Sequence, residues 1–370
     1  MMTLSHRHLR ASWLTLMLVL SVFLVSSLQA GGKFYQQRNL VSDGGVPAEH
    51  TDTNLVNPWG IVFSPTSPVW VADNATGVAT LYDGDGVPRS LVVTIDSTGP
   101  VNPTGIVFNA SSSDFVVSQG SASAPSLFIF ASENGTIAGW ASTVDGTHAI
   151  RVVDNSSPEE TRAIYKGLAL AANGSGNFLY ATDFHNSKID VFDSTFKPAT
   201  LSGSFSDPLQ PAGFGPFGIR NINGDLYVTY AKQDEEKEDD VAGEGLGVVD
   251  IFDANGNFIR RFAEGGKLNA PWGLALASAD FGEFSNRLLI GNFGDGTINA
   301  YDLATGQFQG QLKGPDGQTL VNEGLWGISF GNGLQHQPTN VLFFAAGPAD
   351  ESHGLYGRIE PAPDSGDAAD

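Results

Sequence analysis

The chain has 370 residues, 45 of them glycine, and only 16% of its residues are charged. This composition is typical of a turn-rich, all-β protein. Because the sequence contains no cysteine, disulfides, cysteine–zinc sites and thiol nucleophiles are excluded. The net charge of −21 disfavours binding to nucleic acids and to anionic membranes, so we expect no nucleic-acid partner.

The first 30 residues have the layout of a secretory signal peptide. Basic residues at positions 6–10 precede an apolar run over residues 13–25, and a cleavage position follows Ala30. The alternative is an uncleaved membrane anchor, although the run is shorter than the roughly 20 residues that span a bilayer. We predict a secreted or extracytoplasmic protein with no membrane span after cleavage. Its net charge changes from −21 to −23, because the peptide removes two arginines and no acid.

One phrase recurs six times along the rest of the chain: a turn, a glycine and three apolar residues. The first two copies are NPWGIVF at residues 57–63 and NPTGIVF at residues 102–108. The six glycines stand 45 to 62 residues apart, at positions 60, 105, 167, 218, 273 and 327. Further apolar runs follow each phrase, for example at 69–73 in the first unit and 114–118 in the second. About four short strands for each unit of this length predict a propeller blade.

The two ends of the repeat predict how the ring closes. The sixth unit ends after its third strand, near residues 355–359, while a spare strand at about residues 34–41 precedes the first unit. Pairing of the two protects edges that would otherwise template aggregation. We therefore predict an all-β, six-bladed β-propeller over residues 31–360 that acts as a monomer. Residues 361–370 are expected to form an acidic, disordered tail.

In such a ring, the residue before each repeat glycine is expected to point at one mouth of the central channel. The ends of the second strands are expected to reach the same face. The pre-glycine set is Trp59, Thr104, Lys166, Phe217, Trp272 and Trp326. The second-strand set is Asp73, Asn74, Gln119, Asp183, His185, Tyr230 and Asn292.

The three tryptophans of the first set leave two interpretations open. Indole faces bind sugars and other flat, partly apolar ligands, with neighbouring polar groups fixing the orientation. The alternative is that the same rings plug the channel and pack the blades against one another. The set predicts a ligand site in the first case and a structural element in the second.

Metal-dependent hydrolysis is the competing chemistry. Propeller lactonases of the gluconolactonase type hold a divalent ion with Glu, Asn and Asp at or near the pre-glycine positions, whereas this chain has mainly aromatic residues there. We predict no cofactor, with Ca²⁺ bound from the second-strand ends as the alternative. The candidate ligands are Asp73, Asp183 and Asn292.

Three further motifs match functional patterns, and each also has a purely structural explanation. Residues 327–331 (GISFG) match a serine-hydrolase pattern, but Ser329 falls inside a repeat strand and not on a strand-to-helix elbow. The acidic run 234–240 is read as a solvated loop, with a calcium-dependent loop as the alternative. His185 follows Asp183 by two residues, so on a strand both side chains point to the same side. This spacing suggests an acid–base pair, and the alternative is a solvated strand end.

The phrases at residues 57–60, 270–273 and 292–298 together resemble a family of secreted bacterial proteins of unknown function, similar to the NHL-repeat propellers. The resemblance covers roughly residues 35–360 and implies a propeller fold and export, without any activity. From the residues we favour a binding module for an extracellular glycan, peptide or protein, with no catalytic residues. The alternatives are a metal-dependent lactonase or esterase and a structural extracellular protein without a ligand site.

Overall fold

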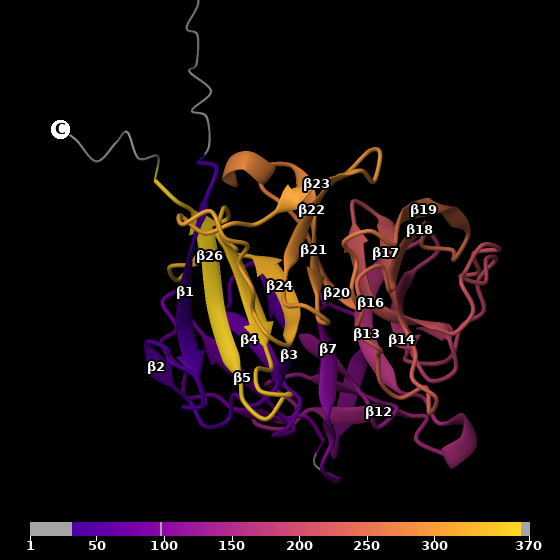
Figure 1. Cartoon of the computed structure of the whole chain (residues 1–370). Helices are drawn as coiled ribbons and strands as arrows, with labels where there is room; N and C mark the ends of the chain where they lie inside the picture. Colours follow the sequence, from indigo (N-terminus) through magenta and orange to yellow (C-terminus); the bar gives the residue numbers. More distant parts are fainter. Residues whose placement is uncertain (1–31, 97, 364–370) are drawn as a thin grey trace, which may run out of the picture. The chain divides into compact units, whose positions relative to one another are not determined.

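The computed structural model describes residues 32–96 and 98–363 (Figure 1). The predicted signal peptide and residues 364–370 of the predicted tail lie outside this range. The described part is all-β, and its only helical elements are two short 3₁₀ helices, Glu159–Thr161 and Gly282–Phe284. None of its helices is long and apolar enough to cross a membrane.

Six of the seven described sheets stand around a hub, as the repeat predicts, and each of the six is one blade of a β-propeller. Five innermost strands begin within two residues of a repeat glycine, and β16 begins four residues before its own. They are β3 (Pro58–Phe63), β7 (Pro103–Phe108), β13 (Tyr165–Ala172), β16 (Phe214–Ile222), β20 (Pro271–Leu276) and β24 (Leu325–Phe330). We number the blades 1 to 6 in this order.

The remaining strands follow outward within each blade. Blade 3 keeps only three strands in its sheet, while the other blades have four or more. The outward strands are β4 (Val69–Asp73), β5 (Val78–Tyr82) and β6 (Val93–Thr94) in blade 1; β10 (Phe128–Ser132), β11 (Thr136–Trp140) and β12 (Ile150–Asp154) in blade 2; β14 (Asn177–Asp183) and β15 (Lys188–Phe192) in blade 3; β17 (Asp225–Lys232), β18 (Gly247–Phe252) and β19 (Phe258–Glu264) in blade 4; β21 (Arg287–Asn292), β22 (Ile298–Asp302) and β23 (Phe308–Gln311) in blade 5; and β25 (Leu342–Ala346) and β26 (Leu355–Pro361) in blade 6.

The predicted closure of the ring is confirmed. Strand β1 (Tyr35–Ser42) pairs antiparallel with β26 and so supplies the fourth strand of blade 6. A two-residue strand, β2 (His50–Thr51), adds to its outer side. Figure 1 shows the indigo N-terminal strand beside the yellow C-terminal one. The first and last described strands therefore share one sheet, which leaves neither as a free edge at the junction.

The repeat glycines explain why the phrase is so regular. A Cβ on Gly60 would stand 2.5 Å from the carbonyl oxygen of Thr104 in blade 2. A Cβ on Gly327 would meet the carbonyl oxygen of Trp59 at the same distance, which joins blade 6 back to blade 1. Each of these glycines lies against the backbone of the next inner strand, so only glycine allows the close approach.

The second unit departs from the prediction. The run at residues 114–118 is not the second strand of blade 2, because β8 (Val116–Gln119) forms a separate hairpin with β9 (Ala122–Pro125). The true second strand is β10, which is buried along its whole length, whereas β8 buries only one of its four residues. The hairpin is an insertion, and it accounts for the long spacing between Gly105 and Gly167.

Candidate functional site

The pre-glycine side chains gather at one end of the hub, where the inner strands begin. None of the six exposes more than 9% of its surface. Four of them form one apolar cluster with two phenylalanines from neighbouring loops and two alanines. We name its aromatic members the plug: Trp59, Phe184, Phe217, Trp272, Phe293 and Trp326.

The rings of the plug cover each other's faces. Trp59 and Trp326 stack with centroids 3.4 Å apart, and Phe293 stacks on Trp326 at 4.1 Å. Trp272 meets Trp59 and Trp326 edge-on, at 6.0 and 5.7 Å. Edge-to-face and offset-stacked rings are favourable geometries for aromatic pairs. This packing is what a structural plug between the blades predicts. Binding of a ligand to these rings at this end of the channel stays a prediction.

A charged group covers the plug on its outer side. Lys166 is buried with 1% exposure, and its Nζ lies 2.5 Å from Glu133 Oε1 and 3.2 Å from Asp239 Oδ1. The same Nζ lies 5.2 Å from the centre of the Trp59 ring, within the range of a cation–π contact. Burial favours a lower pKa for Lys166, but the two carboxylates outweigh it and the pKa is raised.

Two more acids belong to this group. Glu351 accepts a hydrogen bond from Trp326 Nε1 at 3.1 Å. Burial raises the pKa of Asp240 to about 7, although Lys166 nearby favours its charged form. We name Glu133, Lys166, Asp239, Asp240 and Glu351 the cap. The acidic run predicted as a solvated loop therefore contributes two carboxylates to the cap over the plugged end.

The second-strand residues mostly serve their own blades. The carboxylate of Asp183 accepts hydrogen bonds from the backbone N–H of Ile164, at 3.2 Å, and from Asn186. The side chain of Asn292 accepts from the backbone N–H of Asn269 at 3.2 Å and donates to the carbonyl of Lys267. Both side chains thus hold the loop that enters the inner strand of the same blade.

The other members of this set are scattered. Asp73 is fully buried in blade 1, where burial raises its pKa well above the usual value. Tyr230 belongs to a hydrophobic cluster between blades 3 and 4. Gln119 is exposed at the end of β8, in the inserted hairpin, and does not join the pre-glycine set. Asn74 alone of the set contacts the cap, donating to Glu133 Oε2 at 2.9 Å.

The proposed calcium ligands are therefore not brought together. Asp73, Asp183 and Asn292 end the second strands of three different blades. Within residues 32–96 and 98–363, no three His, Cys, Asp or Glu side chains are placed so that they could hold a metal ion. No hydrogen bond joins His185 to Asp183 in the described structure, since the carboxylate is engaged as above.

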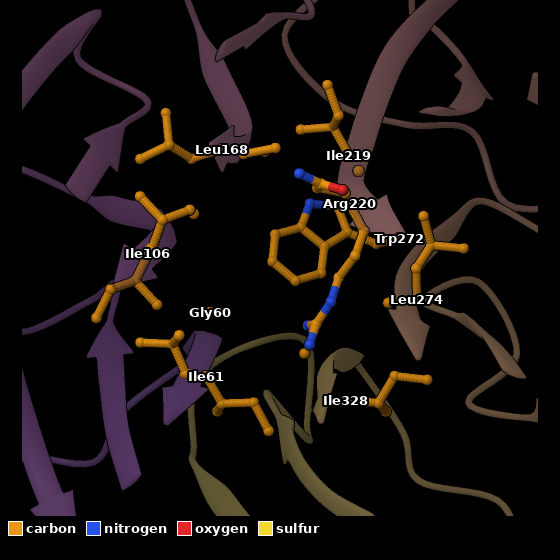
Figure 2. A pocket seen from close by; sticks show the side chains of 18 of the residues that line it. Gly60, Ile61, Ile106, Leu168, Ile219, Arg220, Trp272, Leu274 and Ile328 are labelled. Carbon is orange, nitrogen blue, oxygen red and sulfur yellow. The ribbon is translucent and has the colours of Figure 1, made fainter. Parts of the chain in front are cut away.

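We name the ring of six repeat glycines the glycine belt. A cavity of about 210 Å³ occupies the channel on the side of this belt away from the plug (Figure 2). Trp272 is the one plug residue that lines it, so the plug closes this cavity at its inner end. Figure 2 shows Ile106 and Leu168 on one side and Leu274 and Ile328 on the other. At the far ends of the inner strands, Phe108 and Leu170 line the cavity and are partly exposed, as the channel reaches solvent there. We name this cavity the channel pocket.

Arg220 enters this pocket from blade 4 (Figure 2), and Asn221 of the same strand also lines it. Its guanidinium donates one hydrogen bond, to Ser329 Oγ in blade 6 at 3.2 Å. In the part of the chain that the structure describes, Arg220 forms no ion pair, and burial alone lowers its pKa. The channel pocket therefore contains a cation that no protein anion neutralises.

The sequence carried a signal for this pair that the sequence analysis missed. Arg220 and Ser329 both stand two residues after a repeat glycine. The other four repeats have Val62, Val107, Ala169 and Ala275 at that position. Two polar residues at a position that is apolar in the other four repeats are a more specific signal for a site than the GISFG pattern at residues 327–331.

Comparison with known proteins shows relatives in a giant virus. No family model matches the chain. The chain is 34% identical to "Uncharacterized protein R648" of Acanthamoeba polyphaga mimivirus over 327 residues, which are 86% of this chain and 78% of the relative. It is also 34% identical to "Uncharacterized protein L690" of the same virus, over 86% of this chain and 84% of that protein. These relatives are viral, so they do not support the bacterial, NHL-like family that the sequence resembles.

Solved structures share the fold at low sequence identity. A streptogramin B lyase covers 89% of this chain and 98% of its own, with a TM-score of 0.52 and 14% identity. A glucose dehydrogenase covers 88% of this chain and all of its own, with a TM-score of 0.52 and 12% identity. Such identities establish architecture and leave activity open. By sequence, the chain belongs to the same family as the mimivirus proteins R648 and L690.

Proposed function

We propose that this protein is a binding module whose ligand enters the channel pocket from the open end and rests against Trp272. The single observation behind this proposal is the cavity of about 210 Å³ that the plug closes on one side. A concave, mostly apolar pocket with a few polar groups is the usual form of a small-molecule site. A purely structural role predicts no pocket, and the presence of one favours binding.

The pocket also narrows the class of ligand. An engineered cavity of roughly 150 Å³ binds benzene. A volume of about 210 Å³ fits one ring with a small substituent. A glycan, peptide or protein is far larger, so such a ligand places at most one side group in the channel. We propose that the protein binds this ligand outside the cell, in line with the predicted signal peptide, and performs no chemistry on it.

The test is calorimetric titration of the purified protein with benzamide, a neutral probe of this size. We expect saturable binding that falls at least tenfold in Ile106→Phe, since the larger ring fills the channel. Ile259→Phe makes the same change on the outer strand β19, where the side chain is 48% exposed, and is expected to bind as the wild type does.

A second variant, Ile106→Ala, keeps the test decisive if Ile106→Phe fails to fold, because alanine widens the pocket instead of filling it. We expect this variant to accept probes larger than benzamide, such as naphthamide, that the wild type binds weakly. Absence of binding in the wild type, or binding that neither change at position 106 alters, would contradict the proposal.

A further inference from the structure

Two cations of the hub differ in what surrounds them. Lys166 is buried and has Glu133 and Asp239 within 3.2 Å. Arg220 is partly exposed in the channel pocket, and among the described residues its only hydrogen-bond partner is the hydroxyl oxygen of Ser329. Removing a charge even partly from water without a counter-charge is unfavourable, and proteins normally pair such groups. Four of the six repeats show that a small apolar residue serves the fold at the position of Arg220. Packing of the ring therefore does not explain the guanidinium.

We propose that Arg220, whose guanidinium Ser329 helps to hold in place, forms an anion site in the channel pocket that selects small monocarboxylates with an apolar or aromatic body. This inference rests on the proposed function, because the carboxylate belongs to the ligand that occupies the same pocket.

The geometry of the pair suits a carboxylate. A guanidinium presents a planar fork of N–H donors that matches the two oxygens of a carboxylate. One N–H of Arg220 is used by Ser329 Oγ, which leaves other donors free. The Ser329 hydroxyl accepts that bond and retains its own hydrogen, for which the described structure shows no acceptor. A carboxylate that enters beside Arg220 therefore meets guanidinium donors from blade 4, with the Ser329 hydroxyl of blade 6 next to them.

The charge and the walls define the rest of the ligand. One guanidinium balances one negative charge, so a dianion such as sulfate or phosphate would bring an uncompensated charge into an apolar channel. Isoleucine and leucine side chains line the walls, and Trp272 closes the inner end. These surfaces favour an apolar body, and the indole favours an aromatic one. Benzoate combines all three features at about the right size.

The experiment compares benzoate with benzamide, which has nearly the same shape and no charge. Both are titrated calorimetrically into the wild type, Arg220→Met, Arg220→Lys and Ser329→Ala. We expect the wild type to bind benzoate at least tenfold more tightly than benzamide. Arg220→Met is expected to lower benzoate affinity at least tenfold and benzamide affinity by a smaller factor, since benzamide offers the guanidinium only a neutral carbonyl oxygen. Arg220→Lys should restore part of the preference, and Ser329→Ala should weaken benzoate about threefold.

Arg287→Met is the matched control, since Arg287 lies on β21 in a partly exposed ion pair with Asp302. It is expected to bind benzoate like the wild type, and saturable benzamide binding that persists in Arg220→Met shows that the pocket is intact. If the wild type binds benzoate and benzamide equally, the anion site is wrong while the proposed function stands. If neither binds, both proposals fall. Displacement of benzoate by equimolar chloride or sulfate would overturn the selection of carboxylates.

Discussion

The two ends of the central channel are built from the same repeat but treat buried charge in opposite ways. At the plugged end, aromatic rings fill the space and the charge of Lys166 is balanced by carboxylates of the cap. At the open end, apolar side chains leave a pocket, and Arg220 has no carboxylate partner in the described structure. A cation whose carboxylate partners belong to the protein serves the fold, whereas a cation in a pocket without such partners points to a ligand.

The glycine belt separates the two ends. Each repeat glycine lies against the next inner strand, and Trp272 is the one plug residue that also lines the channel pocket. Four of the six residues before a repeat glycine belong to the plug, and four of the six residues two positions after one line the pocket. Substitutions on the two sides should therefore separate stability from binding.

The largest effect is expected at the plug. Trp326→Ala removes a ring that stacks on Trp59 and Phe293, and should lower the free energy of unfolding by about 3–5 kcal/mol. Chemical denaturation followed by circular dichroism measures this change. Leu209→Ala, at a position that is 74% exposed, should change it by less than about 0.5 kcal/mol. A similar loss in both variants would show that the rings do not act as a plug.

The cap should give the next largest effect. Lys166→Met leaves Glu133 beside the plug without its cation, and should lower the free energy of unfolding by roughly 2–4 kcal/mol. Adding Glu133→Gln should recover part of this loss, since the unpaired charge disappears. A double-mutant cycle on the four proteins measures the coupling, and strictly additive losses would count against a Lys166–Glu133 pair.

Much of the ring could be predicted from the sequence, because its determinants are local. Gly60 and its equivalents are required by close backbone contact, so the repeat appears in the sequence as directly as in space. The spare strand near residues 34–41 follows from counting strands. The hairpin at 116–125 was missed because its short alternating strand looks like a blade strand until β10, which is buried throughout, is compared with it.

The site was harder to predict, since it depends on how blades meet. The sequence places Trp59, Trp272 and Trp326 at the hub, but only the structure shows that their faces cover one another. In the sequence Asp183 and Asn292 look like ligands that are free to bind an ion. Their backbone hydrogen-bond partners lie in a loop about 20 residues earlier, so the sequence does not show that these side chains are already engaged. The sequence shows Arg220 as a polar residue at an apolar position of the repeat. Only the structure shows that it has no carboxylate partner among the described residues.

A pH effect should also distinguish the cap from the pocket. In the folded protein the pKa of Asp240 is about 7, against a reference of 3.8, so the folded state holds a proton that the unfolded chain releases between these values. The free energy of unfolding should therefore fall by about 1–3 kcal/mol as the pH rises from 4 to 8. Asp240→Asn removes this contribution, and denaturation of both proteins at pH 4, 6 and 8 measures the difference. Identical pH profiles would contradict the assignment.

The smallest effect on stability is expected in the pocket, with the opposite sign to that of the plug. Arg220→Met removes a desolvated charge that no carboxylate balances, so the free energy of unfolding should stay constant or rise by up to about 1 kcal/mol. Thermal and chemical denaturation measure this change. A loss comparable to that in Trp326→Ala would mean that Arg220 supports the fold, and the contrast between the two ends would disappear.

The central claim, that one end of the channel is sealed and the other receives a carboxylate, is tested most directly by a crystal structure of the protein with benzoate. We predict density for the carboxylate within hydrogen-bonding distance of Arg220 and for the ring against Trp272. An empty channel, or benzoate among Trp59, Trp326 and Lys166 at the capped end, would contradict the account.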